Sequence, residues 1–123
     1  MTTTPEGRVS AALRQAVLNY DGEIRKVQWQ GRVGAPDWLV MMWGCAVFVE
    51  AKAPGARPRK SQLVEFERIE RASGIPVLVI DRAEDASRII DALLSRTEGN
   101  YKAYRRLCDE YSFERFLNEE QCG

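Results

Sequence analysis

Apolar residues along the chain change several times between helical and strand-like spacing. Over residues 5–20 they recur every three or four positions, the period of a helix with one buried face. That face carries Val9, Ala12, Leu13, Ala16, Val17 and Tyr20. The threonines at positions 2–4 are candidate helix caps, Pro5 suits the first turn, and Asp21-Gly22 suits the end. We therefore predict a first helix over residues 5–20.

Three strands are predicted next. Residues 23–30 intersperse apolar with polar side chains, which favours a strand with one buried side. Residues 31–36 contain two glycines and a proline and are predicted to form a loop. Two apolar runs then flank Gly44-Cys45. Because both runs are apolar on both faces, they are typical of central strands that helices cover on each side.

The turn between these two runs decides which residues face one another. We interpret Gly44-Cys45 as a two-residue hairpin loop with glycine in its first position. Asp37 then lies opposite Lys52, and Leu39 lies opposite Glu50. Because side chains alternate along a strand, Asp37, Glu50 and Lys52 are predicted to project from the same face at the same end of the sheet.

The second half of the chain returns to helical spacing. Residues 53–60 are predicted to form a basic loop, and Ser61 to cap a second helix that ends at Ser73-Gly74. Val77–Ile80 is a short buried strand, and the helical connection before it favours a parallel neighbour. A third helix is predicted to begin at Asp81 or Arg82. The order α-β-β-β-α-β-α predicts a three-layer α/β domain whose mixed sheet is flanked by helices.

The composition changes near residue 99. Aromatic residues and one cysteine follow at helical spacing: Tyr101, Tyr104, Cys108 and Tyr111, with Phe113 and Phe116 beyond them. We assign residues 1–98 to the core domain and residues 99–123 to a C-terminal helical extension. An aromatic helix of this kind either packs on the core or forms a dimer interface, and the sequence favours neither.

The overall composition is that of one ordinary globular domain of 123 residues. The 18 Lys and Arg residues balance 18 Asp and Glu residues, which argues against a general polyanion-binding protein but leaves local charge segregation open. No apolar run is long enough to span a membrane, and the first residues do not form a secretory signal. Three cysteines without a CxxC pair indicate a cytoplasmic protein rather than a disulfide framework.

The chain contains no histidine. This excludes Ser-His-Asp and Cys-His catalysis, histidine-based zinc sites and nucleases whose general base is a histidine. Any hydrolytic chemistry must therefore use carboxylates, lysine and a metal ion.

Asp37, Glu50 and Lys52 are the candidates for that chemistry. In many proteins an aspartate after a proline is a turn residue, and a Glu-x-Lys on a strand is a solvated edge. Here Glu50 and Lys52 continue an apolar strand that is otherwise covered, and a buried carboxylate needs a partner or a metal. Two carboxylates and an ammonium at one sheet edge suit a divalent metal beside a phosphate.

These residues resemble the motifs of the PD-(D/E)XK nuclease superfamily and, within it, the VRR-NUC (virus-type replication-repair nuclease) domain. The matching pieces are Glu6 on the first helix, GAPD at 34–37, VEAK at 49–52 and Ser61-Gln62 at the start of the second helix. The element order also matches, over residues 5 to about 95. The resemblance implies a restriction-endonuclease-like core. Ala51 departs from the pattern, since a larger apolar residue is common there, but the family uses this position through its carbonyl.

The resemblance also implies a role for each residue. Asp37, Glu50 and the Ala51 carbonyl would bind Mg²⁺ or Mn²⁺ in an oxygen-rich shell. That ion would polarise the scissile phosphate and help to form hydroxide from a bound water. Lys52 would orient the attacking water and stabilise negative charge in the transition state.

Two further residues have an alternative explanation. Glu6 would reach the metal directly or through water, but it is also a favourable charge at a helix N-terminus. Gln62 would position the water or the Lys52 ammonium, but a surface polar residue is equally consistent with its place.

Basic residues follow the second strand of the hairpin, with no acid between Ala51 and Ser61. Arg57, Arg59 and Lys60 are therefore predicted to contact the backbone of DNA, and Arg32 in the earlier loop is a second candidate. No motif for base-specific readout is present, so recognition of DNA shape is expected. The tryptophans are predicted to be core residues, although stacking on bases would suit them too: Trp29, Trp38 and Trp43.

The sequence thus predicts a Mg²⁺- or Mn²⁺-dependent endonuclease that hydrolyses DNA phosphodiester bonds. By resemblance, the expected substrate is branched DNA, a four-way junction or flap, in the replication, repair or recombination of a bacterial or phage-infected cell. A homodimer is expected, and no membrane association. The alternatives are a nucleic-acid-binding module that keeps the fold without cutting, and a small interaction protein whose charges are surface charges.

Overall fold

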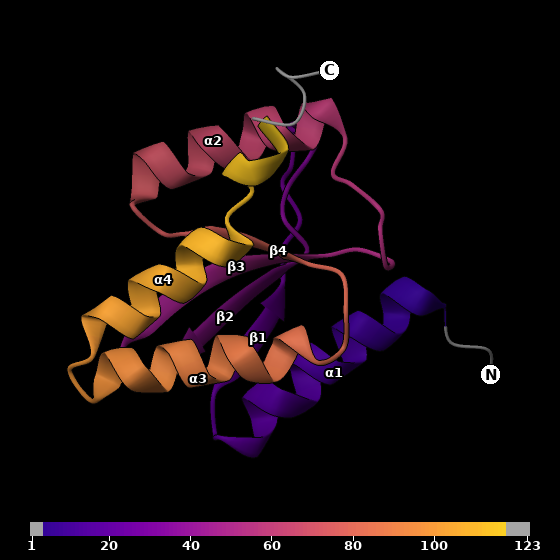
Figure 1. Ribbon diagram of the computed structural model, residues 1–123. Helices are drawn as coiled ribbons and strands as arrows, with labels where there is room; N and C mark the ends of the chain where they lie inside the picture. The colour runs from indigo at the N-terminus through magenta and orange to yellow at the C-terminus, as the bar shows by residue number, and fades with distance from the viewer. Residues whose placement is uncertain (1–3, 118–123) are drawn as a thin grey trace.

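Helices cover both faces of a four-stranded mixed sheet in the computed structural model, which describes residues 4–117 (Figure 1). The elements are α1 (Pro5–Asn19), β1 (Glu23–Lys26), β2 (Trp38–Met42), β3 (Cys45–Ala51), α2 (Lys60–Ser73), β4 (Val77–Ile80), α3 (Asp85–Thr97) and α4 (Tyr101–Tyr111). The strand order is β1-β2-β3-β4, with β4 parallel to β3 and the other pairs antiparallel. The predicted three-layer α/β class, mixed sheet and parallel last strand are confirmed.

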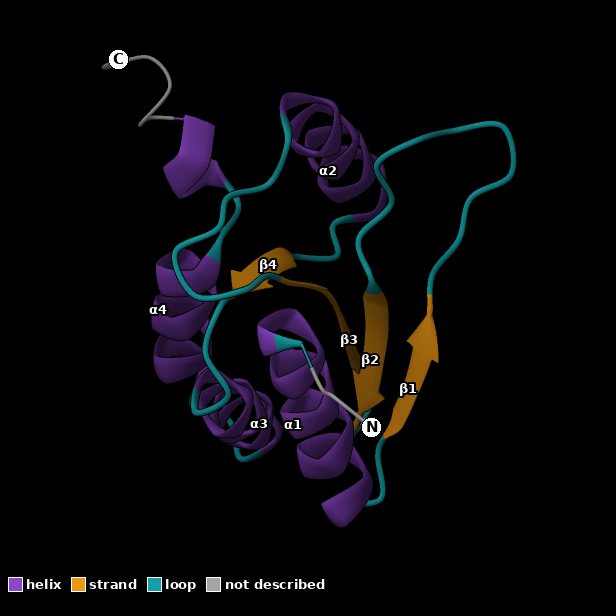
Figure 2. Cartoon of the chain, turned by 90° about the vertical axis from the view of Figure 1, so that its right-hand side faces the viewer, coloured by secondary structure: helices purple, strands orange, loops and turns teal. Residues whose placement is uncertain are grey.

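The two faces of the sheet are covered by different helices. α1, α3 and α4 lie on one face and α2 on the other (Figure 2). Along β3, Val47 and Val49 pack with α1 and α3, whereas Phe48 packs with Phe66 of α2. Because side chains alternate along the strand, Glu50 lies on the α2 face with Phe48.

The β2–β3 hairpin turns one residue earlier than predicted. Its two-residue loop is Trp43-Gly44, and both residues have positive φ, 51° and 77°, as a type I′ turn requires. Trp43 is therefore at the tip of the hairpin, where it is 36% exposed and packs edge-to-face on Tyr20. The prediction that Trp43 is a core residue was wrong. Trp29 and Trp38 are half-buried and pack against the two cores.

The earlier turn changes the pairing but keeps the faces. Leu39 pairs with Phe48, not with Glu50, and the same register continued by one step sets Asp37 opposite Glu50, not Lys52. The predicted pairing was therefore wrong by two residues. Since two residues are one full period of a strand, every side chain stays on its predicted face.

Four element boundaries can be compared with the sequence predictions. Thr4 caps α1 as proposed, its hydroxyl accepting from the Gly7 N–H at 3.0 Å. β1 ends at Lys26 rather than at residue 30, and α3 begins at Asp85 rather than at residue 81 or 82. α2 begins at Lys60 with Arg59 as its N-cap, so Ser61 is not the cap. Within residues 4–117, no helix is both long and apolar enough to cross a membrane.

The part of the C-terminal segment that the structure describes, residues 99–117, packs on the core. α4 lies beside α3, and Ser112 then forms a bridge to Leu78 at the free edge of β4 (Figure 1). Phe113 is buried, and its ring meets Phe66 edge-to-face at 6.0 Å. Of the two predicted roles for this segment, packing on the core is what these contacts show. Residues 118–123 lie outside the described residues.

Candidate active site

Asp37, Glu50 and Lys52 meet on the α2 face of the sheet, at the end where β2 begins and β3 stops. The backbone pairing of β2 with β3 ends at Trp38 and Val49, and beyond it side-chain carboxylates accept hydrogen bonds from backbone N–H groups. The Asp37 N–H donates to Glu50 Oε1 at 3.1 Å, and the Ala51 N–H donates to Asp37 Oδ2 at 2.9 Å. These two bonds hold the carboxylates beside each other across the strand pair.

Glu50 is the most buried charged group of the site, at 2% exposure. Burial raises the pKa of Glu50 from 4.5 to about 7, and the neighbouring Asp37 charge adds to the rise, while Lys52 opposes it. A carboxyl group that titrates near neutral pH is unusual among structural residues and common at catalytic centres.

Lys52 and Gln62 complete the cluster from the strand and from the first turn of α2. The Lys52 ammonium lies 3.2 Å from Glu50 Oε2 and donates to Gln62 Oε1 at 3.1 Å. Gln62 Nε2 donates to Glu50 Oε2 at 2.9 Å, and its Oε1 also accepts from the Arg59 N–H at 2.8 Å. Gln62 therefore caps α2 and fixes both charged groups, so its explanation as a solvated surface residue was wrong.

The donor set fits a hard divalent cation with few protein ligands. Within residues 4–117, no group of three or more carboxylate, thiol or imidazole side chains is placed to hold a metal. Two adjacent carboxylates remain, Asp37 and Glu50, beside the Ala51 carbonyl that follows in the chain. Their mutual repulsion, which contributes to the raised pKa of Glu50, is what a cation between them would relieve.

Glu6 is exposed in the first turn of α1, and α1 covers the face of the sheet opposite to α2. Four residues further along this helix, the Ser10 hydroxyl accepts from Trp38 Nε1 at 3.3 Å, next to Asp37 in the chain. Glu6 thus lies one turn beyond a helix–sheet contact, with no bond to either carboxylate. A metal-binding role for Glu6 stays a prediction.

The predicted DNA-binding residues form two groups, one at the start of α2 and one in the 31–36 loop. Arg59 and Lys60 are exposed at the start of α2, and Arg57 lies 5.7 Å over the Phe116 ring. Arg32 Nε donates to both oxygens of the buried Glu65, at 3.1 and 3.2 Å. Arg32 therefore anchors its own loop to α2, whatever it contributes to DNA binding.

Two residues dock the 31–36 loop onto α2: sequence reasoning missed Glu65, and it singled out Gly34 only as part of the GAPD motif. Glu65 is an acid on the buried side of α2, three residues after Gln62, and that position was a signal for an ion pair. Gly34 has φ +94°, and a Cβ there would lie 2.9 Å from the Ser61 carbonyl oxygen. Only glycine lets the loop approach α2 this closely, and Asp37 follows three residues later.

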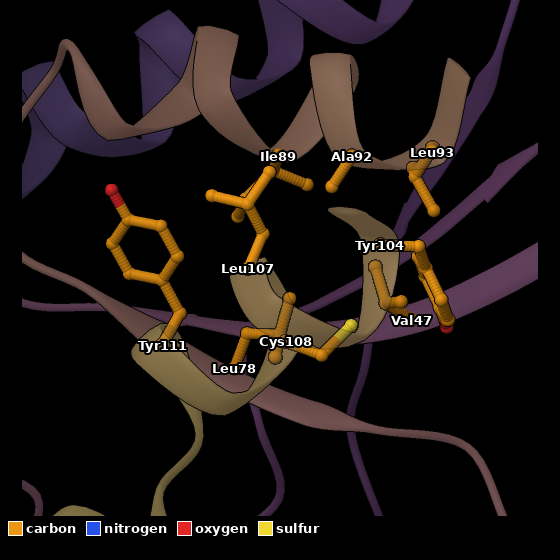
Figure 3. Close-up of a pocket in the computed structure, with 9 residues that line it drawn as sticks. All are labelled: Val47, Leu78, Ile89, Ala92, Leu93, Tyr104, Leu107, Cys108 and Tyr111. Carbon is orange, nitrogen blue, oxygen red and sulfur yellow. The ribbon is translucent and has the colours of Figure 1, made fainter. Parts of the chain in front are cut away.

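A small apolar cavity elsewhere is lined by side chains from β3, β4, α3 and α4 (Figure 3). Tyr104 and Cys108 line it, and burial raises the pKa of Cys108 to about 11. The thiol is therefore protonated at neutral pH and unsuited to nucleophilic chemistry. This cavity is part of the core, not a second active site.

Comparison with known proteins identifies the family of this chain. No family model matches the chain. A solved structure described as a VRR_NUC domain is 36% identical in sequence and has a TM-score of 0.64. The match covers 72% of this chain and 96% of the chain in that structure. This chain belongs to the VRR-NUC family. A curated relative named "Putative nuclease p44", from Acyrthosiphon pisum secondary endosymbiont phage 1, is 38% identical over 89 residues, which are 72% of this chain and 94% of the relative.

The VRR-NUC assignment confirms the predicted family, and with it a nuclease of this type. Each match leaves more than a quarter of this chain uncovered. The roles of individual residues, the metal and the DNA structure stay predictions.

Proposed function

We propose that this VRR-NUC protein is a metal-dependent endonuclease that hydrolyses DNA phosphodiester bonds. The observation that carries the proposal is the contact between Glu50 and its three neighbours, Asp37, Lys52 and Gln62, on one face at the end of the sheet. A buried carboxylate beside a second carboxylate and an ammonium is a costly arrangement for a purely structural protein, and it suits phosphodiester hydrolysis.

Each side chain has a task in this proposal. Asp37, Glu50 and the Ala51 carbonyl hold Mg²⁺ or Mn²⁺, which supplies Lewis acidity and a bound water of lowered pKa. Lys52, whose side chain is only 14% exposed, offers its ammonium to the negative charge that develops on the phosphate. Gln62 keeps that ammonium in place through its Oε1 atom.

The DNA backbone lies, in this proposal, over the start of α2, where Arg57, Arg59 and Lys60 are exposed. Branched DNA, a four-way junction or flap, is the proposed substrate, by family resemblance. A homodimer suits paired cuts in a four-way junction, because two-fold symmetry places two such sites on the two symmetric strands.

Cleavage of a labelled DNA panel tests the proposal. The panel contains single strand, duplex, flap and four-way junction, each with Mg²⁺, with Mn²⁺ or with EDTA. We expect metal-dependent cutting by the wild type, none in EDTA, and a loss of about 10²-fold or more in Lys52→Ala, because one preorganised charge is removed from the transition state. Arg71→Ala, which removes an exposed cation from the last turn of α2, is the matched control and should cut normally.

Asp37→Asn separates chemistry from folding. The amide oxygen still accepts from the Ala51 N–H, so the strand ends stay joined while the charge is lost. We expect a folded protein that neither cuts nor binds Mn²⁺ in calorimetry. Tight junction binding by a wild type that never cuts would instead favour the binding module, and equal cutting by wild type and Lys52→Ala would refute the mechanism.

A further inference from the structure

The outer face of α4 carries a group of cations that the active site does not use. Lys102, Arg105 and Arg106 are exposed, and with Tyr101 and Asp109 they line a shallow surface hollow. Their spacing of three and four residues puts them on one side of the helix. Within residues 4–117, none of the three cations forms a hydrogen bond or an ion pair.

Packing and helix stability do not explain these cations. α4 turns its other side, with Tyr104, Leu107 and Tyr111, toward α3 and the sheet. The helix dipole favours acids in the first turn and cations in the last, but α4 has neither an acid in its first turn nor a base in its last. The nearby Arg88 shows the contrasting case, since it is bound at 2.8 and 2.9 Å by both oxygens of Glu110.

We infer that the outer face of α4 is a second contact for the phosphate backbone of nucleic acid. Three unpaired cations on a chain of zero net charge are a local segregation of charge that a polyanion complements. Tyr101, 58% exposed with the Arg96 guanidinium 5.8 Å over its ring, adds an aromatic surface beside them. This inference rests on the proposed function, because it assigns a second binding surface for the same substrate.

The second contact is distant from the active site. Tyr104 of α4 accepts from Cys45 at the first residue of β3, at 3.8 Å, while Glu50 lies five residues along that strand, or about 16 Å. Figure 1 shows α4 starting on the left of the molecule, whereas the loop into α2 lies on the right. At 3.4 Å per nucleotide along a strand, the two contacts are separated by about five nucleotides or more.

Binding of the full chain to labelled four-way junctions in EDTA, which prevents cutting, tests the inference. The triple variant K102Q/R105Q/R106Q should bind at least tenfold more weakly, and the slope of log K against log salt should fall by about 2 to 3, because each lost phosphate contact removes about 0.9. In hydroxyl-radical footprints, one protected stretch should disappear while the stretch at the cleavage point remains.

Two single variants sharpen the test. Arg106→Gln and Arg71→Gln each remove one exposed helical arginine, and only Arg106→Gln should weaken binding. Asp109→Asn removes the acid beside the three cations and should strengthen binding to the junction. Since all of these side chains are exposed, thermal unfolding should stay at the wild-type midpoint.

The outcomes separate this inference from the proposed function. If the wild type cuts DNA but the triple variant keeps the affinity, salt slope and footprint of the wild type, the α4 contact is refuted and the nuclease stands. If the wild type neither cuts nor binds any DNA of the panel, the proposed function fails and the α4 contact fails with it. A triple variant that loses the distal footprint alone supports the inference.

Discussion

At the scale of single residues, Glu50 is a buried carboxylate in an unusual charge environment. Its carboxylate has lost nearly all contact with solvent and faces a second carboxylate, yet it has an amide, a backbone N–H and an ammonium as donors. The donors stabilise the ionised carboxylate and lower its pKa, but burial has the larger effect and raises the pKa. The same group therefore destabilises the folded chain when ionised and is suited to bind a cation.

Glu50 gives the metal-free protein a defined pH dependence. Below pH 4.5 the group is neutral in both states; between pH 4.5 and about 7 the unfolded chain ionises while the folded chain keeps the proton. The free energy of unfolding should therefore fall as pH rises through this window, by about 3 kcal/mol, and then level off. Urea denaturation in EDTA at several pH values measures it.

Glu50→Gln is the control for this titration. The absence of histidine removes the side chain that ordinarily titrates in this window, although burial also raises the pKa of the Glu70 carboxyl. We expect the fall in stability to disappear in Glu50→Gln. The same fall in both proteins would show that another group causes it.

At the scale of elements, strand alternation was predictable and the turn was not. The two strands of the hairpin were recognisable from their apolar runs, and the parity of positions 37, 50 and 52 is preserved by an even shift in register. The turn was misplaced because Trp43 adopts a positive φ that its own preferences do not favour. The site residues were therefore predicted correctly as one face, while their partners across the strands were not.

The start of α2 allows a direct comparison of the cap predicted from sequence with the cap in the structure. Ser61→Ala should change the free energy of unfolding by less than about 0.5 kcal/mol, because the Ser61 hydroxyl has no bond within residues 4–117. Gln62→Ala should cost about 1 to 3 kcal/mol, since it removes the acceptor for the Arg59 N–H and the donor to Glu50. Equal effects of both substitutions in thermal denaturation would contradict this cap.

The loop before Asp37 should be sensitive to a single methyl group. Gly34→Ala forces a Cβ to 2.9 Å from the Ser61 oxygen and 3.1 Å from the Gln62 Cα, at a φ of +94°. We expect a loss of about 2 kcal/mol or more in stability, and weaker Mn²⁺ binding in calorimetry, because Asp37 moves with the loop.

Gly31→Ala is the matched control for this contact. Gly31 also has a positive φ, +76°, but a Cβ there would meet nothing within 4 Å. It should lose only about 1 kcal/mol from backbone strain and keep its Mn²⁺ affinity. If both variants bind Mn²⁺ equally well, the close approach of Gly34 does not position Asp37.

At the scale of the whole molecule, the nuclease core and the C-terminal segment share one interior. Both comparisons cover 72% of the chain. Sequence patterns gave the helical spacing of this segment but not its partner, because an aromatic stripe suits a core and a dimer interface equally. The contacts of residues 111–116 with β4 and α2 decide in favour of packing within one chain.

Phe113→Ala tests whether this segment stabilises the monomer. The Phe113 side chain is 1% exposed and packs against the Phe66 ring, so removal of its ring should cost about 3 to 5 kcal/mol. That is a large share of the roughly 5–15 kcal/mol that stabilises a domain, whereas Tyr101→Ala, at an exposed site, should cost less than about 0.5 kcal/mol.

Unfolding at two protein concentrations, tenfold apart, distinguishes the two roles of the segment. Packing within one chain predicts the same loss at both concentrations, and a loss that shrinks at the higher concentration would instead place Phe113 in a dimer interface.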